Sequence, residues 1–421
     1  MDRKESRKLT KKKRKSQSCK TYEVKVDKSK LSTEKQDYLK LLFLEAKWFY
    51  NFCLSQEDVF KSDTTLYEIP VMNKDKEFEN RELKVLSSQM KQSIRTRIKG
   101  SILALSTLKK KGKKVGRLKF KSRVESIPLV QYDKTYFINF ENNTIKIQGF
   151  KPTFKVIGLE QLPKDCEIAN ATIIKKCDDY YFKITTYQEK QIKDIPEGEI
   201  AIDFGCDTQL TFDNGIKIEF DFPVTRQIKR LDRKIMKGNR KKSNNKWKDQ
   251  KKREKLYERL VNQKKDVANK IVHAITTNYD VVIFQDESIK AWQHGTHGKK
   301  ITNTAIGGIM RDLKTKSHTP IEVNKFFPST QTCPICGCTR PMELKDREFE
   351  CYACGYVEDR DIKSAICIKQ EGLKQIPMDY RFKLEENSSS TRFYSILSQI
   401  NGIKVSKKSS SIQEASGLDP R

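Results

Sequence analysis

Apolar residues recur every three or four positions in several long stretches of the chain, and this spacing predicts helices. One apolar stripe runs from Leu39 to Cys53, and a second periodic stretch covers 83–110. Two more stripes lie within 227–277, on either side of a polar break from Gly238 to Asn245. The polar break predicts that this region forms a helical hairpin.

Other stretches alternate between apolar and polar residues, which is the pattern of half-buried strands. Residues 20–27 alternate in this way, and short alternating runs separated by turns continue from about 117 to 190. We expect a small β-barrel or sheet here, with the helices of 30–112 inserted after its first strand. Residues 198–220 predict a strand and then a hairpin closed by Asn214-Gly215, a strong turn signal. Further buried strands are predicted over 280–285 and 320–326, and a helix from about 361.

The two ends of the chain predict little regular structure. Residues 1–18 are a basic run that we expect to be a disordered tail, and 382–421, rich in Ser, Lys and Asn, predicts a flexible tail. No stretch approaches the roughly 20 apolar residues of a membrane span. No apolar region follows the basic N-terminus as it would in a secretory signal. We therefore expect no membrane partner and a place in the prokaryotic cytosol, associated with the nucleoid.

The charge of the chain indicates a polyanionic partner. Lys and Arg total 85 against 55 for Asp and Glu, which gives a net charge of +30. A lysine-covered surface in solvent explains this poorly, because the excess is spread along most of the chain. Phosphate backbones are the commonest such partner. The basic positions of Gly116–Lys121 fit either a phosphate-binding edge or a solvated strand face. The candidate nucleic-acid-binding residues are Lys119, Lys121, Arg230, Arg233, Lys241 and Lys242.

Four of the eleven cysteines stand in two C-x-x-C pairs, which predicts a structural zinc site rather than a disulfide framework. The predicted zinc ligands are Cys333, Cys336, Cys351 and Cys354. Gly337 and Gly355 follow the two pairs directly, where positive φ is often needed. Cys338 is a possible competing ligand, but the 333/336 pair has the better spacing. Four thiolates leave no open position for water, so the zinc is expected to be structural.

Three acidic positions predict a second, catalytic metal site. Asp203 stands at the end of one predicted strand, Glu287 at the end of another, and Asp361 at the start of a helix after the second cysteine pair. A carboxylate on a buried strand is costly unless it is paired or binds a metal. Asp361 has the alternative of being a simple helix cap. Carboxylates suit Mg²⁺, and a pair of such ions is typical of phosphodiester cleavage.

Several motifs, taken in order, resemble the TnpB family, transposon-encoded relatives of the compact type V CRISPR effectors. The motifs are Gly116–Lys121, Ala201–Gly205, Phe284–Trp292, Ser329–Cys333 and Cys354–Asp361. The resemblance covers roughly residues 20–375. It implies an RNA-guided DNA endonuclease with a guide RNA and a target DNA as partners, either as a monomer or as a homodimer on the RNA. In such a protein, base pairing supplies sequence specificity while the protein holds the backbone.

The resemblance also implies an α+β multidomain fold. Its N-terminal part is a wedge β-barrel with an inserted helical recognition lobe, and its C-terminal part is an RNase H-like RuvC domain with an embedded four-cysteine zinc ribbon. The expected bounds are 19–30 and 113–192 for the barrel, 31–112 for the lobe, 193–326 and 356–381 for the RuvC domain, and 327–355 for the ribbon. The RuvC acids of the family transfer to Asp203 and Asp361.

Two departures from the family pattern concern the catalytic site. Gln285 stands where many relatives have the second acid, and Lys363 stands where relatives often have Asn. Period-two geometry would keep Glu287 on the face of Gln285, so Glu287 is the expected ligand, with Asp286 in reserve. These departures leave open a guide-dependent DNA-binding repressor with weakened or lost cleavage. A transposase that joins strands itself is the weakest alternative.

Overall fold

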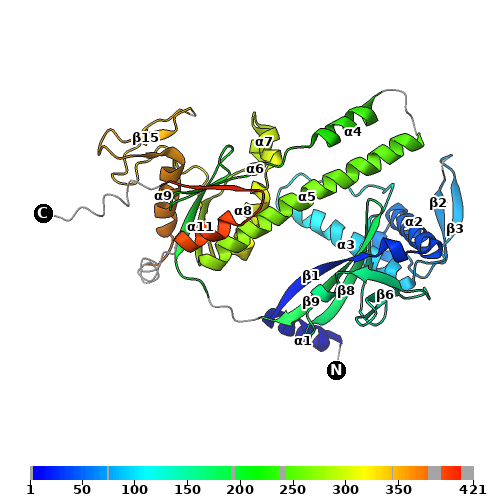
Figure 1. The fold of residues 1–421 in the computed structure, drawn as a ribbon. Coiled ribbons are helices and arrows are strands. Elements are labelled where there is room, and N and C mark those ends of the chain that lie inside the picture. Colours follow the sequence, from blue (N-terminus) through cyan, green and yellow to red (C-terminus); the bar gives the residue numbers. More distant parts are fainter. Residues whose placement is uncertain are drawn as a thin grey trace. The chain divides into compact units, whose positions relative to one another are not determined.

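The computed structural model describes residues 3–73, 75–190, 195–237, 243–343, 345–377 and 390–408 (Figure 1). The chain divides into two compact units, Met1–Ile192 and Lys193–Arg421. Each unit has its own sheet and its own buried core. Among the helices described, none is both long enough and apolar enough to cross a bilayer.

The first unit is built on a seven-stranded sheet in the order β4-β8-β9-β1-β7-β6-β5. The strands are β1 (Gln17–Val26), β4 (Ser126–Leu129), β5 (Tyr136–Asn139), β6 (Thr144–Ile147), β7 (Phe154–Ile157), β8 (Glu167–Lys176) and β9 (Asp179–Glu189). The hydroxyl of Tyr136, which begins β5, donates to the carbonyl of Ala169 in β8 at 3.0 Å. The two ends of the sheet therefore approach each other, and the sheet forms a nearly closed barrel.

Helices inserted between β1 and β4 pack on this barrel. They are α2 (Thr33–Ser55) and α3 (Ser88–Lys110), with the hairpin β2 (Glu68–Met72) and β3 (Phe78–Glu82) between them. Tyr38 of α2 stacks on Phe150 with ring centroids 3.8 Å apart, and Phe43 lies against Tyr180 of β9. The insertion therefore shares one hydrophobic core with the barrel. Short 3₁₀ turns cover Lys28–Lys30, Val59–Lys61 and Leu159–Gln161.

The basic N-terminal segment is folded in the structure, whereas the sequence predicts a disordered tail over 1–18. Helix α1 (Arg3–Ser16) leads directly into β1. Arg14 and Lys13 form ion pairs with Glu167 of β8, and the Arg14 guanidinium lies 3.6 Å from the ring centroid of Tyr187. The partners in these contacts lie on strands far along the chain. The prediction of a disordered tail was wrong because amino-acid composition does not show such partners.

The second unit is built on a six-stranded sheet in the order β14-β13-β10-β11-β12-β17. The strands are β10 (Glu199–Phe204), β11 (Leu210–Phe212), β12 (Ile216–Glu219), β13 (Val281–Gln285), β14 (Thr319–Val323) and β17 (Lys404–Lys407). β10, β13 and β14 are parallel neighbours, whereas β10, β11, β12 and β17 pair in antiparallel fashion. The predicted hairpin turn is confirmed, because Gly215 has φ of +80° between β11 and β12.

Helices cover both faces of this sheet. The helices of this unit are α4 (Arg226–Met236), α5 (Asn244–Asn278), α6 (Ile289–His294), α7 (Gly298–Asn303), α8 (Ile306–Lys316), α9 (Arg360–Leu373) and α11 (Ser390–Ser398). α9 packs on the face that carries Ala201 and Ile283, and α5 and α8 pack on the face that carries Ile202 and Phe284. A Cβ atom at Gly372 would lie 2.3 Å from a methyl group of Ile283, so α9 approaches β13 closely.

The sequence predicts a flexible tail over 382–421, but part of this segment completes the second sheet. Phe393 of α11 is fully buried against Phe212 and Tyr279, and β17 pairs with β12. The prediction was wrong for 390–408, because the partners of this segment lie in distant parts of the chain. The remaining residues of the expected tail lie outside the described residues.

Candidate metal centres and nucleic-acid interface

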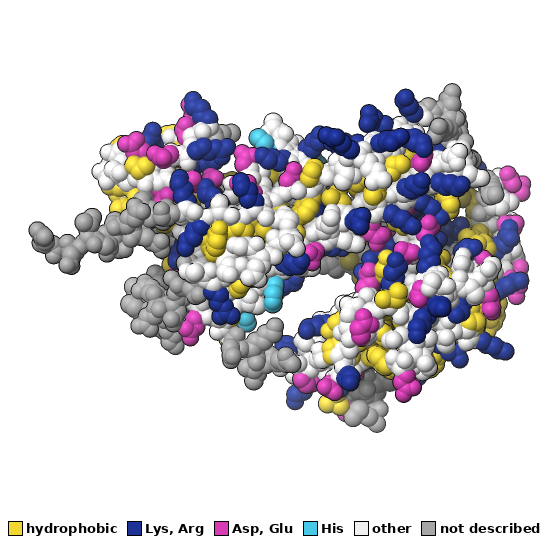
Figure 2. Space-filling view, in the orientation of Figure 1, with side chains coloured by type: hydrophobic (Ala, Val, Ile, Leu, Met, Phe, Trp, Pro, Cys, Tyr) yellow, Lys and Arg dark blue, Asp and Glu magenta, His cyan; other side chains and the backbone are white. Residues whose placement is uncertain are grey.

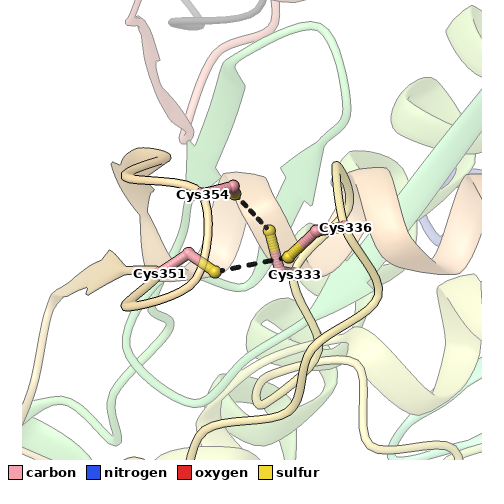
Figure 3. A group of neighbouring side chains, drawn as sticks. All are labelled: Cys333, Cys336, Cys351 and Cys354. Carbon is pink, nitrogen blue, oxygen red and sulfur yellow. Dashed lines mark hydrogen bonds between the residues drawn. The ribbon is translucent and has the colours of Figure 1, made fainter.

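The four predicted zinc ligands converge in one small cluster. Two loops carry them, and the second loop lies between β15 (Glu348–Glu350) and β16 (Val357–Asp359) (Figure 3). The four sulfur atoms all lie within 4.8 Å of one another, with 3.6 Å between Cys333 and Cys354 and 3.5 Å between Cys336 and Cys351. Zn–S bonds of about 2.3 Å in a tetrahedron would place sulfurs about 3.8 Å apart, so the cluster fits zinc.

The two cysteine loops repeat the same backbone pattern. The N–H of Cys333 donates to the carbonyl of Cys338, and the N–H of Cys351 donates to that of Tyr356, both at 2.8 Å. The glycine after each C-x-x-C pair has positive φ, +74° at Gly337 and +70° at Gly355, as predicted. Cys338 thus supports the first loop through its backbone, and its sulfur is not part of the four-sulfur group.

Asp203 lies near the carboxyl end of β10, on the face that α9 covers. Side chains alternate along a strand, and Ala201, two residues earlier, packs in the core beneath α9. In the described part of the chain, no Lys or Arg nitrogen lies within 4.0 Å of this carboxylate. Burial, together with the negative charges of Asp361 and Glu287, raises the pKa of Asp203 to about 8.

Asp361 occupies the first turn of α9, where the preceding acid caps the helix. The carboxylate of Asp359 accepts the backbone N–H groups of Asp361 at 3.1 Å and Ile362 at 3.3 Å. The Lys217 ammonium of β12 lies 2.7 Å from Asp359 and holds the pKa of that carboxyl below its ordinary value, although burial opposes this. Because Asp359 takes the capping role, the carboxylate of Asp361 is left to face Arg360 at 3.1 Å.

The second acidic motif differs from its prediction. β13 ends at Gln285, and the N–H of Glu287 donates to the Gln285 carbonyl in a tight turn, so the period-two argument for Glu287 does not apply. Glu287 is nevertheless close enough to raise the pKa of Asp203, and burial raises its own pKa, with a contribution from Asp286. Asp286 is exposed and pairs with Lys314 at 2.7 Å.

The three acids approach one another without forming a tight ligand set. Among the residues described, only the four cysteines bring three or more ligand atoms within 4.8 Å of one another. The carboxylates of Asp361 and Glu287 act electrostatically on Asp203. The pKa of Asp203 is raised by burial and by nearby negative charges. A bound cation would offset both effects, so the site suits a cation. Mg²⁺ usually completes its coordination with water and substrate phosphate, so a wider group suits it.

Basic side chains gather over α4 and α5 (Figure 2). Exposed cations recur along one side of α4, and they are Arg226, Lys229, Arg230, Arg233 and Lys237. Other charges hold the two helices together, since Lys234 pairs with Asp249 and Arg253 with Asp232. The predicted helical hairpin is confirmed, and its exposed side presents the predicted Arg230 and Arg233. The predicted Lys241 and Lys242 lie outside the described residues.

The segment 116–121 is irregular chain rather than a strand. Asn51 of α2 holds it in place by exchanging two side-chain hydrogen bonds, 3.0 and 2.8 Å long, with the backbone of Lys121. The Lys121 ammonium lies 4.2 Å from the ring centroid of Tyr50, and Lys119 is exposed. The segment is therefore an exposed basic chain that is attached to α2 and is not a strand.

Comparison with known proteins gives similarities to RNA-guided nucleases. A family model described as Cas12f1-like, TNB domain, matches residues 312–368, which include all four cysteines and Asp361. A protein of Streptomyces pristinaespiralis whose name gives it as an RNA-guided DNA endonuclease is 23% identical over 265 residues. That match spans 61% of this chain and 65% of the relative, slightly less than two thirds of its length.

Solved structures of compact effectors are also similar. A Cas12f1–sgRNA–target DNA complex is 13% identical, with 80% of this chain and 83% of that chain covered and a TM-score of 0.46. A mini-RNA-guided endonuclease, CRISPR-Cas_phi3, is 9% identical, with 86% and 93% covered and a TM-score of 0.41.

We expect Cys351→Ser to remove most of the zinc, which should be present at about one ion per chain in the parent protein. Loss of one thiolate breaks the closed tetrahedral set. Metal analysis of the purified protein checks this, with Cys338→Ser as the matched control. Loss of zinc from the Cys338 variant and retention in the Cys351 variant would contradict the assigned ligands.

The raised pKa of Asp203 gives a pH dependence to the Mg²⁺-free protein. The folded state keeps this proton up to about pH 8, whereas the unfolded chain releases it near the ordinary aspartate pKa of 3.8. The contribution of Asp203 to stability therefore falls as pH rises through this window. Asp203→Asn should raise the Tm at pH 8 by about 3 °C or more relative to the parent, with a smaller gap at pH 5. Thermal melts at both pH values measure the gap, and a gap that does not change with pH would refute the assignment.

Proposed function

Because the chain belongs to the TnpB-like, compact type V family, we propose that it is an RNA-guided DNA endonuclease. The observation that carries this proposal is that Asp361 and Glu287, from two other elements, lie close enough to Asp203 on β10 to raise its pKa. We assign this sheet with α9 to a RuvC-type nuclease domain. The cysteine cluster is its embedded zinc ribbon, and the barrel with inserted helices is the wedge and recognition lobe.

The chain's own residues would prepare the site for phosphodiester hydrolysis. Asp203 is the acid whose pKa is raised by burial and by the charges of Asp361 and Glu287, so it would gain most from a bound cation. Asp361 is directed by the Asp359 cap, and Glu287 contributes from the turn after β13. Bound Mg²⁺ would activate water and stabilise the charge on the cleaved phosphate. A transposon origin and a guide RNA encoded with it are part of the same proposal.

The basic side of α4 would hold a nucleic-acid backbone. Its cations follow a helical stripe, and in the described part of the chain Arg230 and Arg233 have no acidic partner within ion-pair distance. Such contacts bind phosphates without reading sequence, which fits a protein whose specificity comes from base pairing. The exposed Lys119 on the segment before β4 is a second candidate contact.

A guide-dependent DNA-binding protein with weakened cleavage is the second candidate function. The specific observation in its favour is Gln285, a neutral amide that directly follows Phe284, whose partner on β10 is Ile202, the residue before Asp203. The side chain is fully engaged by protein groups and cannot supply a carboxylate. Guided binding without any nicking in the presence of Mg²⁺ would select this function over the endonuclease.

Asp203→Ala should lower guide-dependent cleavage of target DNA in Mg²⁺ by at least about 100-fold, since loss of a ligand costs no less than loss of an outer-shell partner. Binding of guide RNA should stay unchanged. The assay is a cleavage time course with copurified RNA whose sequence defines the target. Asp312→Ala, which removes an acid from α8, is the control. Equal cleavage by the Asp203 variant and the parent would exclude this metal site.

The double variant Arg230→Gln/Arg233→Gln should weaken RNA binding and lower its salt dependence. Each lost phosphate contact on a single strand reduces the slope of log K against log salt by about 0.7. Filter binding at a series of salt concentrations measures the slope. The control is Lys345→Gln/Lys374→Gln, two exposed lysines already paired with Glu343 and Glu371. Equal slopes for both double variants would exclude α4 as the backbone contact.

A further inference from the structure

Lys363 is a fully buried lysine on α9, two residues after Asp361. Its ammonium donates to the carbonyl of Ser329 at 2.9 Å and to that of Thr332 at 3.2 Å. It also lies 4.2 Å from the ring centroid of Phe349. Burying an ammonium is costly unless its donors are satisfied. These contacts satisfy them, so the 329–332 loop and α9 are held together by this side chain.

The same loop is joined to the end of β13 by Gln285. The hydroxyl of Ser329 donates to the Gln285 side-chain oxygen at 3.1 Å. The Gln285 amide group donates in turn to the carbonyls of Asn324 at 3.1 Å and Phe327 at 2.9 Å. A glutamate here would set a carboxylate oxygen against two carbonyl oxygens. The two departures from the family pattern, at 285 and 363, are therefore parts of one buried hydrogen-bond network.

This network connects the zinc ribbon to the acidic edge of the sheet. At one end, Thr332 precedes the zinc ligand Cys333, and Phe349 packs in the small core of the ribbon. At the other end, Gln285 is the last residue of β13, and it directly follows Phe284, whose partner on β10 is Ile202, the residue before Asp203. Every link is a direct contact between buried or partly buried groups, so a displacement at one end has to be absorbed by the other.

We propose that Lys363 is a positioning residue that couples the four-cysteine ribbon to the carboxyl end of β13 through Ser329 and Gln285. Zinc retention then depends on a side chain at the sheet edge, and the position of that edge depends on the ribbon. The effect on DNA cleavage rests on the function proposed above. The coupling itself does not, because it is measured without nucleic acid.

The first experiment compares zinc release from the full chain into a chromogenic chelator, well below the melting temperature. Lys363→Met keeps an unbranched side chain that is one atom shorter and removes its donors, and it should release zinc about 10-fold faster, as for other outer-shell partners. Lys369→Met is the matched control. This lysine lies on the same helix, and its ammonium pairs with Glu199 and Asp213 instead of the ribbon. The control should lower the Tm but release zinc at nearly the parent rate.

The decisive variant is Gln285→Met, which changes the sheet edge and touches no cysteine loop. Coupling is reciprocal, so this variant should also speed zinc release several-fold. The double variant Gln285→Met/Lys363→Met should release zinc no faster than Lys363→Met alone, because both substitutions break the same hydrogen-bond network. Hydrogen exchange of 324–332 should rise in both single variants and stay unchanged in Lys369→Met.

Two results would overturn the proposal. Parent-like zinc release from Gln285→Met would mean that Lys363 only supports the ribbon locally. Equal acceleration by Lys363→Met and Lys369→Met would mean that release reports the general stability of α9. If Gln285→Met does not fold, Ser329→Ala, which removes the single hydroxyl link, replaces it with the same expected direction. A parent protein that never cuts DNA would refute the endonuclease function and leave these zinc results standing.

Discussion

Parallel pairing between β10 and β13 is the constraint on which the candidate acid site depends. Parallel strands end at the same edge of a sheet, so Asp203 and the turn that carries Glu287 become neighbours although they are distant in sequence. α9 packs on the same face and brings Asp361 to that edge. Burial and the nearby negative charges of Asp361 and Glu287 raise the pKa of Asp203. A bound cation would offset both effects.

The ribbon is attached to this edge rather than appended to the domain. It lies between β14 and α9 in sequence, and its loops contact α9 through Lys363 and Cys367. The polar contacts beneath it use Gln285, which stands where the family resemblance implies an acid. A neutral amide at this position makes three hydrogen bonds within the protein and supplies no carboxylate to the acid site.

Short sequence patterns predicted correctly those features that depend only on neighbouring residues in the chain. The two C-x-x-C pairs predicted the cysteine cluster, and their glycines have the positive φ that short loops require. Helical periodicity predicted α2, α3 and the α4–α5 hairpin, because an amphipathic stripe needs only its own spacing. Alternation predicted strands of the first sheet, and the Asn214-Gly215 turn signal predicted the hairpin of β11 and β12 in the second sheet. The net charge indicated a polyanionic partner without any structure.

Tertiary structure decided the features whose partners are distant in the chain. From its composition, the sequence predicted that 1–18 and 382–421 are unstructured. In the structure, Glu167 forms an ion pair with Arg14 of α1, and β17 pairs with β12. The sequence identified the candidate acids, but their distances from one another depend on how the strands pair. The turn after Gln285, seen only in the structure, shows that Glu287 does not continue the strand. The sequence by itself determined which residues can bind zinc, cations and phosphate. Which of them meet was decided by long-range packing, because burial and pairing depend on neighbours that no local pattern contains.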